Sequence, residues 1–263
     1  MTVAGARLEC IHFGPQPADA PCIVMLHEGL GCVGLWGEFP AMLQRETGFG
    51  VFVYSRAGYG ASDPVPLPRP LTYMHDEARN VLPLLLDAIG FRECILFGHS
   101  DGASIAAIHA GDVNDARVRG VCLMAPHFFV EDISIASIAE AKIAYEMTDL
   151  RPKLSRWHKN VDCAFRGWSD AWLDPDFRKW NILDSLAKAR ASVLIVQGRE
   201  DQYGTLAQIE RARDVCAAPF ETVILDGVRH SPHREAPQQT LEAVARFARQ
   251  CLDNERASKE RAT

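Results

Sequence analysis

Six short apolar runs recur along this 263-residue chain, and their spacing constrains the fold more than any other feature. Most of the runs are continuously apolar, which is typical of strands that are covered on both faces in a parallel sheet. The predicted strands span residues 22–27, 50–55, 94–98, 120–126, 192–198 and 221–227.

Segments with apolar residues at helical spacing separate these runs. They predict helices over residues 73–90, 102–112 and 239–252, the first of which should end at Gly90. Strands that alternate with helices predict an α/β protein with a mostly parallel central sheet flanked by helices. Residues 7–14 are expected to add an antiparallel strand at one edge of the sheet.

One long segment breaks this alternation. Residues 127–186 contain no convincing strand, and four of the five tryptophans of the chain lie there among other large aromatic residues. An insertion of this size between two sheet strands predicts a helical cap, inserted after the strand at 120–126. The remaining residues, 1–126 and 187–263, are expected to form the core of the fold.

The composition argues against several classes of protein. The formal net charge is -6 with no basic stripe, which argues against binding to nucleic acid. No window approaches the roughly 18 apolar residues of a membrane span, and residues 1–14 lack the apolar core of a signal peptide. The eight cysteines are scattered singly, a pattern that predicts free thiols in the cytoplasm and no metal site. The oligomeric state stays open, a homodimer included.

The sequence GHSDG, centred on Ser100, fits the pattern G-x-S-x-G of a nucleophile elbow. In such an elbow the serine stands at a sharp turn between a strand and a helix, and the glycines leave room for the chain to double back. The required context is present, because a predicted strand precedes Ser100 and a predicted helix follows it.

A serine hydroxyl needs a base, itself oriented by a carboxylate, before it can attack a carbonyl near neutral pH. In this type of site the carboxylate and then the histidine follow the serine along the chain. Asp201 and Glu200 lie just beyond the fifth predicted strand, and His230 and His233 follow the sixth. Because these loops emerge at the same sheet edge as the elbow, the sequence predicts a Ser–Asp/Glu–His triad.

Several motifs together resemble those of the α/β-hydrolase superfamily, over nearly the whole chain. VMLHEGLG is similar to its oxyanion loop, SRAGYGASD to its R-G-x-G-x-S segment and GHSDG to its elbow. GREDQYG is similar to its acid loop, and HSPHREAP to its terminal H-x(4)-E-x-P signature. The resemblance implies an α/β-hydrolase fold with a serine nucleophile.

The resemblance also selects among the candidate acids and histidines. The acid of this family usually falls three residues after the glycine that ends the strand, here Gly198, which implies Asp201. The catalytic histidine precedes the signature glutamate by five positions, so Glu235 implies His230. His233 is then expected to be a structural or pocket-rim histidine.

Two backbone N–H groups are expected to form an oxyanion hole, which stabilises the substrate oxygen when it becomes negative. One donor is the residue after the nucleophile, Asp101. The resemblance implies Gly29, two places after His27, as the other donor, with Leu30 as an alternative. The side chain of Asp101 is expected to pack under the oxyanion loop.

Glu28 departs from the commonest form of this loop, which has glycine directly after the histidine. Its carboxylate is open to three interpretations. It can hold Ser100 or a water, pair with an arginine such as Arg56, or form a salt bridge that only stabilises the loop.

Four residues are predicted to line a substrate pocket. Glu28 and Leu30 belong to the oxyanion loop, and His127 stands at the end of the strand at 120–126. Trp168 is one of the cap aromatics that can wall an apolar acyl group.

The sequence as a whole therefore predicts a carboxylesterase-like serine hydrolase (EC 3.1.1-like). It would cleave an ester, or a related acyl bond, of a small, partly apolar compound through an acyl-enzyme and water, with no cofactor. The alternatives are a thioesterase or a C–C bond hydrolase that acts on meta-cleavage products. A further alternative, of another class, is a non-catalytic ligand-binding protein of the same fold.

Overall fold

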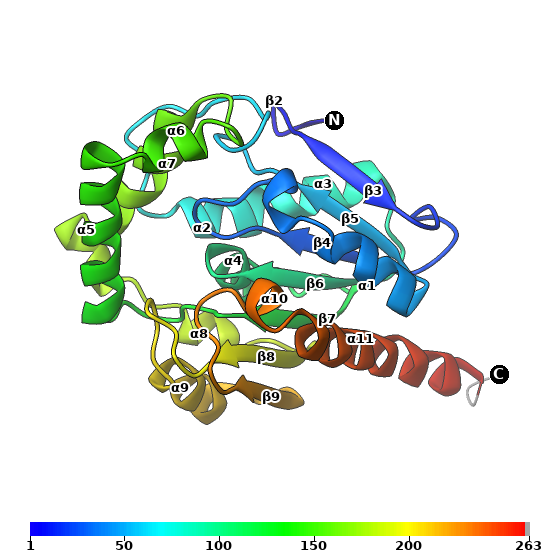
Figure 1. Ribbon diagram of the computed structural model, residues 1–263. Coiled ribbons are helices and arrows are strands. Elements are labelled where there is room, and N and C mark those ends of the chain that lie inside the picture. Colours follow the sequence, from blue (N-terminus) through cyan, green and yellow to red (C-terminus); the bar gives the residue numbers. More distant parts are fainter. Residues whose placement is uncertain (261–263) are drawn as a thin grey trace.

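A computed structural model describes residues 1–260 and contains a central seven-stranded sheet (Figure 1). The strand order is β3-β5-β4-β6-β7-β8-β9, and all neighbours are parallel except β3, which runs antiparallel to β5 at one edge. The strands are β3 (Cys10–Phe13), β4 (Cys22–Leu26), β5 (Gly50–Tyr54), β6 (Cys94–His99), β7 (Val118–Met124), β8 (Ser192–Gly198) and β9 (Phe220–Leu225). The predicted α/β fold, its six core strands and its antiparallel edge strand are confirmed.

Helices cover both faces of the sheet, which explains why the strands are apolar throughout. On β4, Ile23 and Met25 pack with α1 (Phe39–Thr47) and α11 (Pro237–Glu260), whereas the residues between them pack on the opposite face. That second face is covered by α2 (Tyr73–Asp76), η2 (Glu77–Val81), α3 (Leu82–Ile89), α4 (Asp101–Ile108), η3 (His109–Val113) and α9 (Ala207–Val215). Every residue of β4 is fully buried, as expected for a central strand of a doubly covered sheet.

The segment between β7 and β8 is helical, as the sequence predicts. It contains α5 (Asp132–Met147), α6 (Leu150–Leu154), α7 (Val161–Trp172), η4 (Pro175–Lys179) and α8 (Leu183–Leu186). Its only β-type backbone pairing in the described part of the chain is an isolated antiparallel bridge between Phe129 and Asn181. Figure 1 shows α5 standing across the carboxyl ends of the strands, where the candidate site lies. The short α8 packs against α4 and α9 on the body of the fold.

Some elements were not predicted from the sequence. They are the helices α1 and α9, the short helices η1 (Val33–Trp36) and α10 (Pro232–Glu235), and a small hairpin of β1 (Thr2–Val3) and β2 (Ala6–Arg7). All eight cysteines are free thiols, in agreement with the prediction. None of the helices within residues 1–260 combines the length and the apolar character that crossing a membrane requires.

Candidate active site

Ser100 lies at a sharp turn between β6 and α4, in a conformation that few residues other than glycine adopt. Its backbone angles are φ 53° and ψ -116°, which is the strained geometry expected of a nucleophile elbow. A Cβ atom at Gly98 would lie 2.3 Å from the backbone oxygen of Gly102, and one at Gly102 would lie 2.1 Å from that of Leu26. Both glycines are therefore required by close backbone contacts, for the reason that the sequence suggests.

Asp201 and His230 form a buried hydrogen-bonded pair. The Nδ1 atom of His230 lies 2.8 and 2.9 Å from the two carboxylate oxygens of Asp201. The carboxylate also accepts hydrogen bonds from the Gln197 side-chain amide and from the Tyr203 backbone N–H, both at 2.8 Å. Burial alone would raise the pKa of Asp201, but His230 and the hydrogen bond from the Tyr203 N–H lower it to about 2. Asp201 is thus an anion that fixes the orientation of the His230 ring.

The candidates that the resemblance set aside lie elsewhere. Glu200 is exposed, and its backbone N–H donates a hydrogen bond to the Val228 oxygen. His233 is buried against Trp36 and Phe39, and burial lowers its pKa to about 3. The geometry therefore favours Asp201 over Glu200 and His230 over His233.

Glu235 explains the spacing of the histidine loop. Its carboxylate accepts hydrogen bonds from the backbone N–H groups of Arg229 and Ser231, at 3.1 and 3.2 Å. These two residues flank His230 on either side. The glutamate therefore holds the turn that presents the imidazole.

Ser100 and His230 line the same pocket. Within the described residues no hydrogen bond joins the Ser100 hydroxyl to His230, whose Nδ1 already faces Asp201. The Nε2 atom of His230 is then the one that remains to accept the serine proton. Catalytic hydrogen bonds are often long without substrate and tighten when it binds, so this arrangement is compatible with a Ser–His–Asp site.

The oxyanion loop is held closely from two sides. A Cβ atom at Gly29 would lie 2.2 Å from Nε1 of Trp168, so only glycine leaves room for this tryptophan of α7. The backbone oxygen of Leu30 accepts a hydrogen bond from Nε2 of His158, whose Nδ1 accepts one from the Gly60 N–H, both at 3.0 Å. His158 therefore joins two loops.

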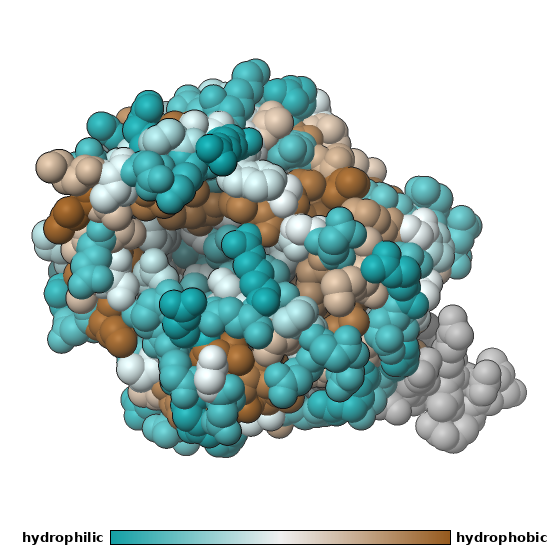
Figure 2. Space-filling view, in the orientation of Figure 1, coloured by the Kyte–Doolittle hydropathy of each residue, from teal (hydrophilic) through white to brown (hydrophobic). Residues whose placement is uncertain are grey.

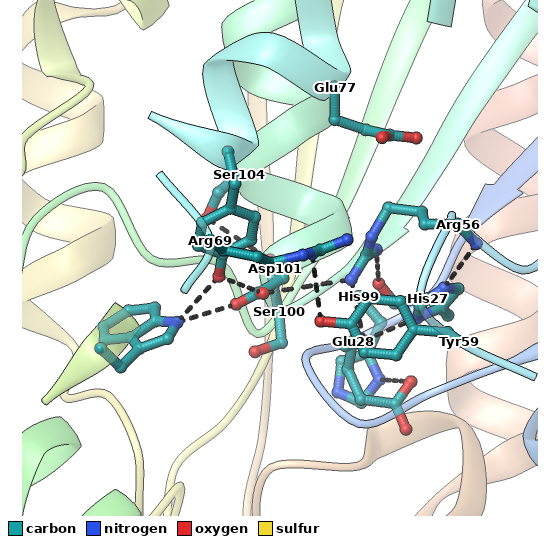
Figure 3. A network of polar contacts seen from close by, with 12 residues as sticks. His27, Glu28, Arg56, Tyr59, Arg69, Glu77, His99, Ser100, Asp101 and Ser104 are labelled. Atoms are coloured by element: carbon teal, nitrogen blue, oxygen red, sulfur yellow. Dashed lines mark hydrogen bonds and ion pairs between the residues drawn. The ribbon is translucent and has the colours of Figure 1, made fainter. Parts of the chain in front are cut away.

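Arg56 lies beneath this loop and is almost fully buried. Its guanidinium donates hydrogen bonds to the backbone oxygens of His27 and Glu28, and one of its nitrogens lies 4.0 Å from the Asp101 carboxylate (Figure 3). The suggested pairing of Arg56 with the Glu28 side chain is therefore not what the structure shows. Arg56 meets the backbone oxygen of Glu28, and its acidic neighbours are Asp101 and Glu77.

The Asp101 carboxylate is fully buried in a polar network. It accepts hydrogen bonds from the Tyr73 hydroxyl at 2.5 Å and from Nε1 of Trp172 at 3.2 Å. Burial raises the pKa of Asp101, and the positive charge of Arg56 together with these hydrogen bonds opposes that rise. The contact with Trp172 ties the nucleophile elbow to α7. Sequence reasoning missed this network, because its members come from four separate segments.

The Glu28 carboxylate points toward His99. Its Oε2 atom lies 3.5 Å from Nδ1 of the His99 ring (Figure 3). Of the interpretations offered by the sequence, a contact with Ser100 is not formed within the described residues, and the carboxylate faces a histidine ring of the elbow instead of an arginine.

His127 is buried at the end of β7, beside the candidate catalytic histidine. Its ring centroid is 5.8 Å from that of His230 and 5.1 Å from that of Trp172. Burial, followed by the neighbouring His230, lowers the pKa of His127 to about 3, so its imidazole is neutral near pH 7. Its Nδ1 atom is enclosed and has no hydrogen-bond partner among the described residues.

A cavity of about 150 Å³ connects these groups. It contains every predicted site residue except Asp201, which lies behind His230. Sequence reasoning missed five lining residues, of which Tyr203 lies within the acid loop itself, two positions after Asp201. The five are His99, Ile138, Trp172, Tyr203 and Ser231. Figure 2 shows a surface that is hollowed between α5 and the strand ends. No group of His, Cys, Asp and Glu suited to a metal ion occurs within the described residues.

A sequence model described as the alpha/beta hydrolase family matches residues 23–243. That range includes the elbow, the acid loop and the histidine loop. No curated protein matches the sequence significantly.

Solved structures of low sequence identity share the fold. A hydrolase from Pseudomonas aeruginosa PA01 is 21% identical, with a TM-score of 0.71 over 94% of this chain and 96% of that one. The enol-lactonase from Burkholderia xenovorans LB400 is 17% identical, with a TM-score of 0.70 over 93% and 97% of the two chains. The naproxen esterase of Bacillus subtilis is 19% identical, with a TM-score of 0.69 over 91% and 87%.

Proposed function

Because the chain belongs to the alpha/beta hydrolase family, we propose that it is a serine hydrolase with Ser100 as its nucleophile. It cleaves an ester, or a related acyl bond, of a small, partly apolar substrate through an acyl-enzyme. The observation that carries this proposal is the Asp201–His230 pair. Nδ1 of His230 is hydrogen-bonded to the carboxylate, and the His230 ring lines the same pocket as Ser100.

The proposed reaction has two halves. His230 accepts the proton of Ser100 at Nε2 as the serine oxygen attacks the carbonyl carbon, and the protonated imidazole then gives that proton to the leaving alcohol. In the second half His230 takes a proton from water, which attacks the acyl-enzyme and releases the acid and free Ser100. The backbone N–H groups of Gly29 and Asp101 are proposed to stabilise the negative oxygen in both halves.

The pocket supports a short, uncharged acyl group as the substrate portion next to Ser100. Its volume of about 150 Å³ is small compared with roughly 300–1,000 Å³ for typical ligand sites. Apolar side chains form much of its wall, namely Leu30, Ile138, Trp168 and Trp172. No lysine or arginine occurs among the described residues that line it. Glu28 would repel a carboxylate in this space. This charge favours neutral esters over meta-cleavage products, which carry a carboxylate.

We also propose that residues 127–186 act as a cap over a core of residues 1–126 and 187–263. The support is that Ile138 of α5 and Trp168 and Trp172 of α7 belong to the pocket wall. The cytoplasmic location, the possible homodimer and the lack of a cofactor stay predictions.

Labelling and a substrate screen test this function together. We expect a fluorophosphonate probe to label the protein, and we expect p-nitrophenyl esters of two to six carbons to be hydrolysed faster than longer or anionic ones. Acyl-CoAs and a meta-cleavage product complete the screen. Turnover of the meta-cleavage product alone would show that the protein is a C–C bond hydrolase. Labelling without turnover of any substrate would favour a ligand-binding role.

Trp168→Ala is expected to shift the preference toward longer acyl chains, because it removes an indole from the pocket wall. We expect the ratio of kcat/KM for the octanoate ester to that for the butyrate ester to rise about tenfold, a typical effect of changing an apolar pocket. Steady-state kinetics with the two p-nitrophenyl esters measures this ratio. Trp157→Ala is the matched control, since Trp157 is half-exposed and lies outside the pocket. An unchanged ratio in Trp168→Ala would show that this indole does not limit chain length.

A further inference from the structure

The His99 imidazole lies between two loops of the proposed active site. Its Nε2 atom donates a hydrogen bond to the backbone oxygen of His230, at 2.7 Å. Its Nδ1 atom lies 3.5 Å from Oε2 of Glu28. One almost fully buried ring of the elbow therefore connects the oxyanion loop after β4 with the histidine loop after β9.

The position of the Glu28 carboxylate is set by close packing. A Cβ atom at Gly31 would lie 2.2 Å from Oε2 of Glu28, so a side chain at position 31 would displace the carboxylate. Gly31 also donates its backbone N–H to the Glu28 carbonyl, at 3.1 Å. The carboxylate is 23% exposed and faces His99 (Figure 3). This arrangement holds a negative charge beside a histidine that contacts the catalytic loop.

One proton position follows from these contacts. A carbonyl oxygen only accepts hydrogen bonds, so Nε2 of His99 must carry a proton. The other ring nitrogen, Nδ1, faces the Glu28 carboxylate. Burial on its own would raise the pKa of Glu28, but the contacts with His99, and then His27 and His233, lower it.

Other titratable groups surround this pair. The rings of His230 and His233 both lie with their centroids 5.2 Å from that of His99. His99 and Glu28 belong to a larger cluster of titratable side chains. Its other members are His27, His127, His230 and His233. Asp201 faces His230 at Nδ1, and Arg234 lies near His233.

We propose that Glu28 and His99 are positioning residues that hold the His230 loop in place while Ser100 is acylated. This inference rests on the proposed function. The hydrogen bond from His99 fixes the backbone of the catalytic histidine. The Glu28 carboxylate keeps the His99 ring oriented.

Glu28→Gln tests the proposal, because it removes the charge and keeps the shape. We expect kcat per labelled site on p-nitrophenyl butyrate to fall about tenfold with KM nearly unchanged, within the hundredfold that a misplaced catalytic group can cost. Glu28→Asp, which retains the charge, should recover part of the loss.

The controls separate positioning from folding and from a failure of the proposed function. Titration with the fluorophosphonate counts folded active sites. Glu38→Gln is the matched control, because it removes an exposed carboxylate from the N-cap of α1. A Glu28→Gln variant with wild-type kcat per labelled site would overturn the positioning role, as would a loss of activity matched by the loss of labelled sites. A wild-type protein that is neither labelled nor active would instead overturn the proposed function.

Discussion

Ser100→Ala is expected to abolish both covalent labelling and turnover. Removal of a serine nucleophile costs roughly 10⁴–10⁶-fold in kcat, because only transition-state binding and the oxyanion hole then remain. Alanine fits the elbow as well as serine does, because it demands no more room than the serine Cβ at the positive φ of this position. Fluorophosphonate labelling, ester kinetics and thermal melting should together show an inactive protein with a Tm close to that of the wild type.

Ser231→Ala is the matched control for this experiment, because Ser231 lines the same pocket directly after the catalytic histidine. It should retain labelling and most of the activity. Persistent labelling of Ser100→Ala would show that another residue is the nucleophile and would refute the assignment of Ser100.

Asp201→Asn is expected to lower kcat by about 10³–10⁴-fold with a smaller change in KM. The amide cannot stabilise the imidazolium that forms on His230, and its NH₂ group can favour the wrong tautomer of the ring. Gln197 and the Tyr203 N–H, which donate to the native carboxylate, would then compete for a single oxygen. Steady-state kinetics from pH 5 to 9 measures the loss.

Glu200→Gln tests the choice between the two neighbouring acids. Glu200 is exposed, so the variant should keep nearly the wild-type kcat. A large loss in Glu200→Gln together with an active Asp201→Asn would reverse the assignment of the triad acid.

The strands were predictable because each strand of a sheet covered on both faces must be apolar along its whole length, and this pattern is visible in a few consecutive residues. A residue such as Ile23 or Val24 must be apolar whichever face it meets, so β4 appears as an uninterrupted run. Helix α1 was harder to predict, because it follows a loop of glycines and begins with Phe39 and Pro40. The hairpin at residues 2–7 is too short to give a pattern.

The site was predictable only where a motif fixes the local backbone. Gly98, whose close contact is with Gly102, and Glu235, which holds the histidine loop, each act within a few residues. The partners of Glu28 and Asp101 were not predictable, because they come from distant segments. A sequence pattern shows that a carboxylate is present, and only the tertiary packing decides which cation or hydrogen bond it meets.

The Arg56–Asp101 contact has a consequence for the evolution of this scaffold. Removal of one partner would leave the other buried with only its more weakly acting opposite charge, Glu77 for Arg56 and Arg69 for Asp101. Breaking a buried ion pair in this way usually costs about 3–5 kcal/mol. Replacements at these two positions are therefore expected to survive selection only as compensating pairs. Laboratory diversification toward new substrates should accordingly leave this polar floor intact and concentrate on the walls that α5 and α7 contribute.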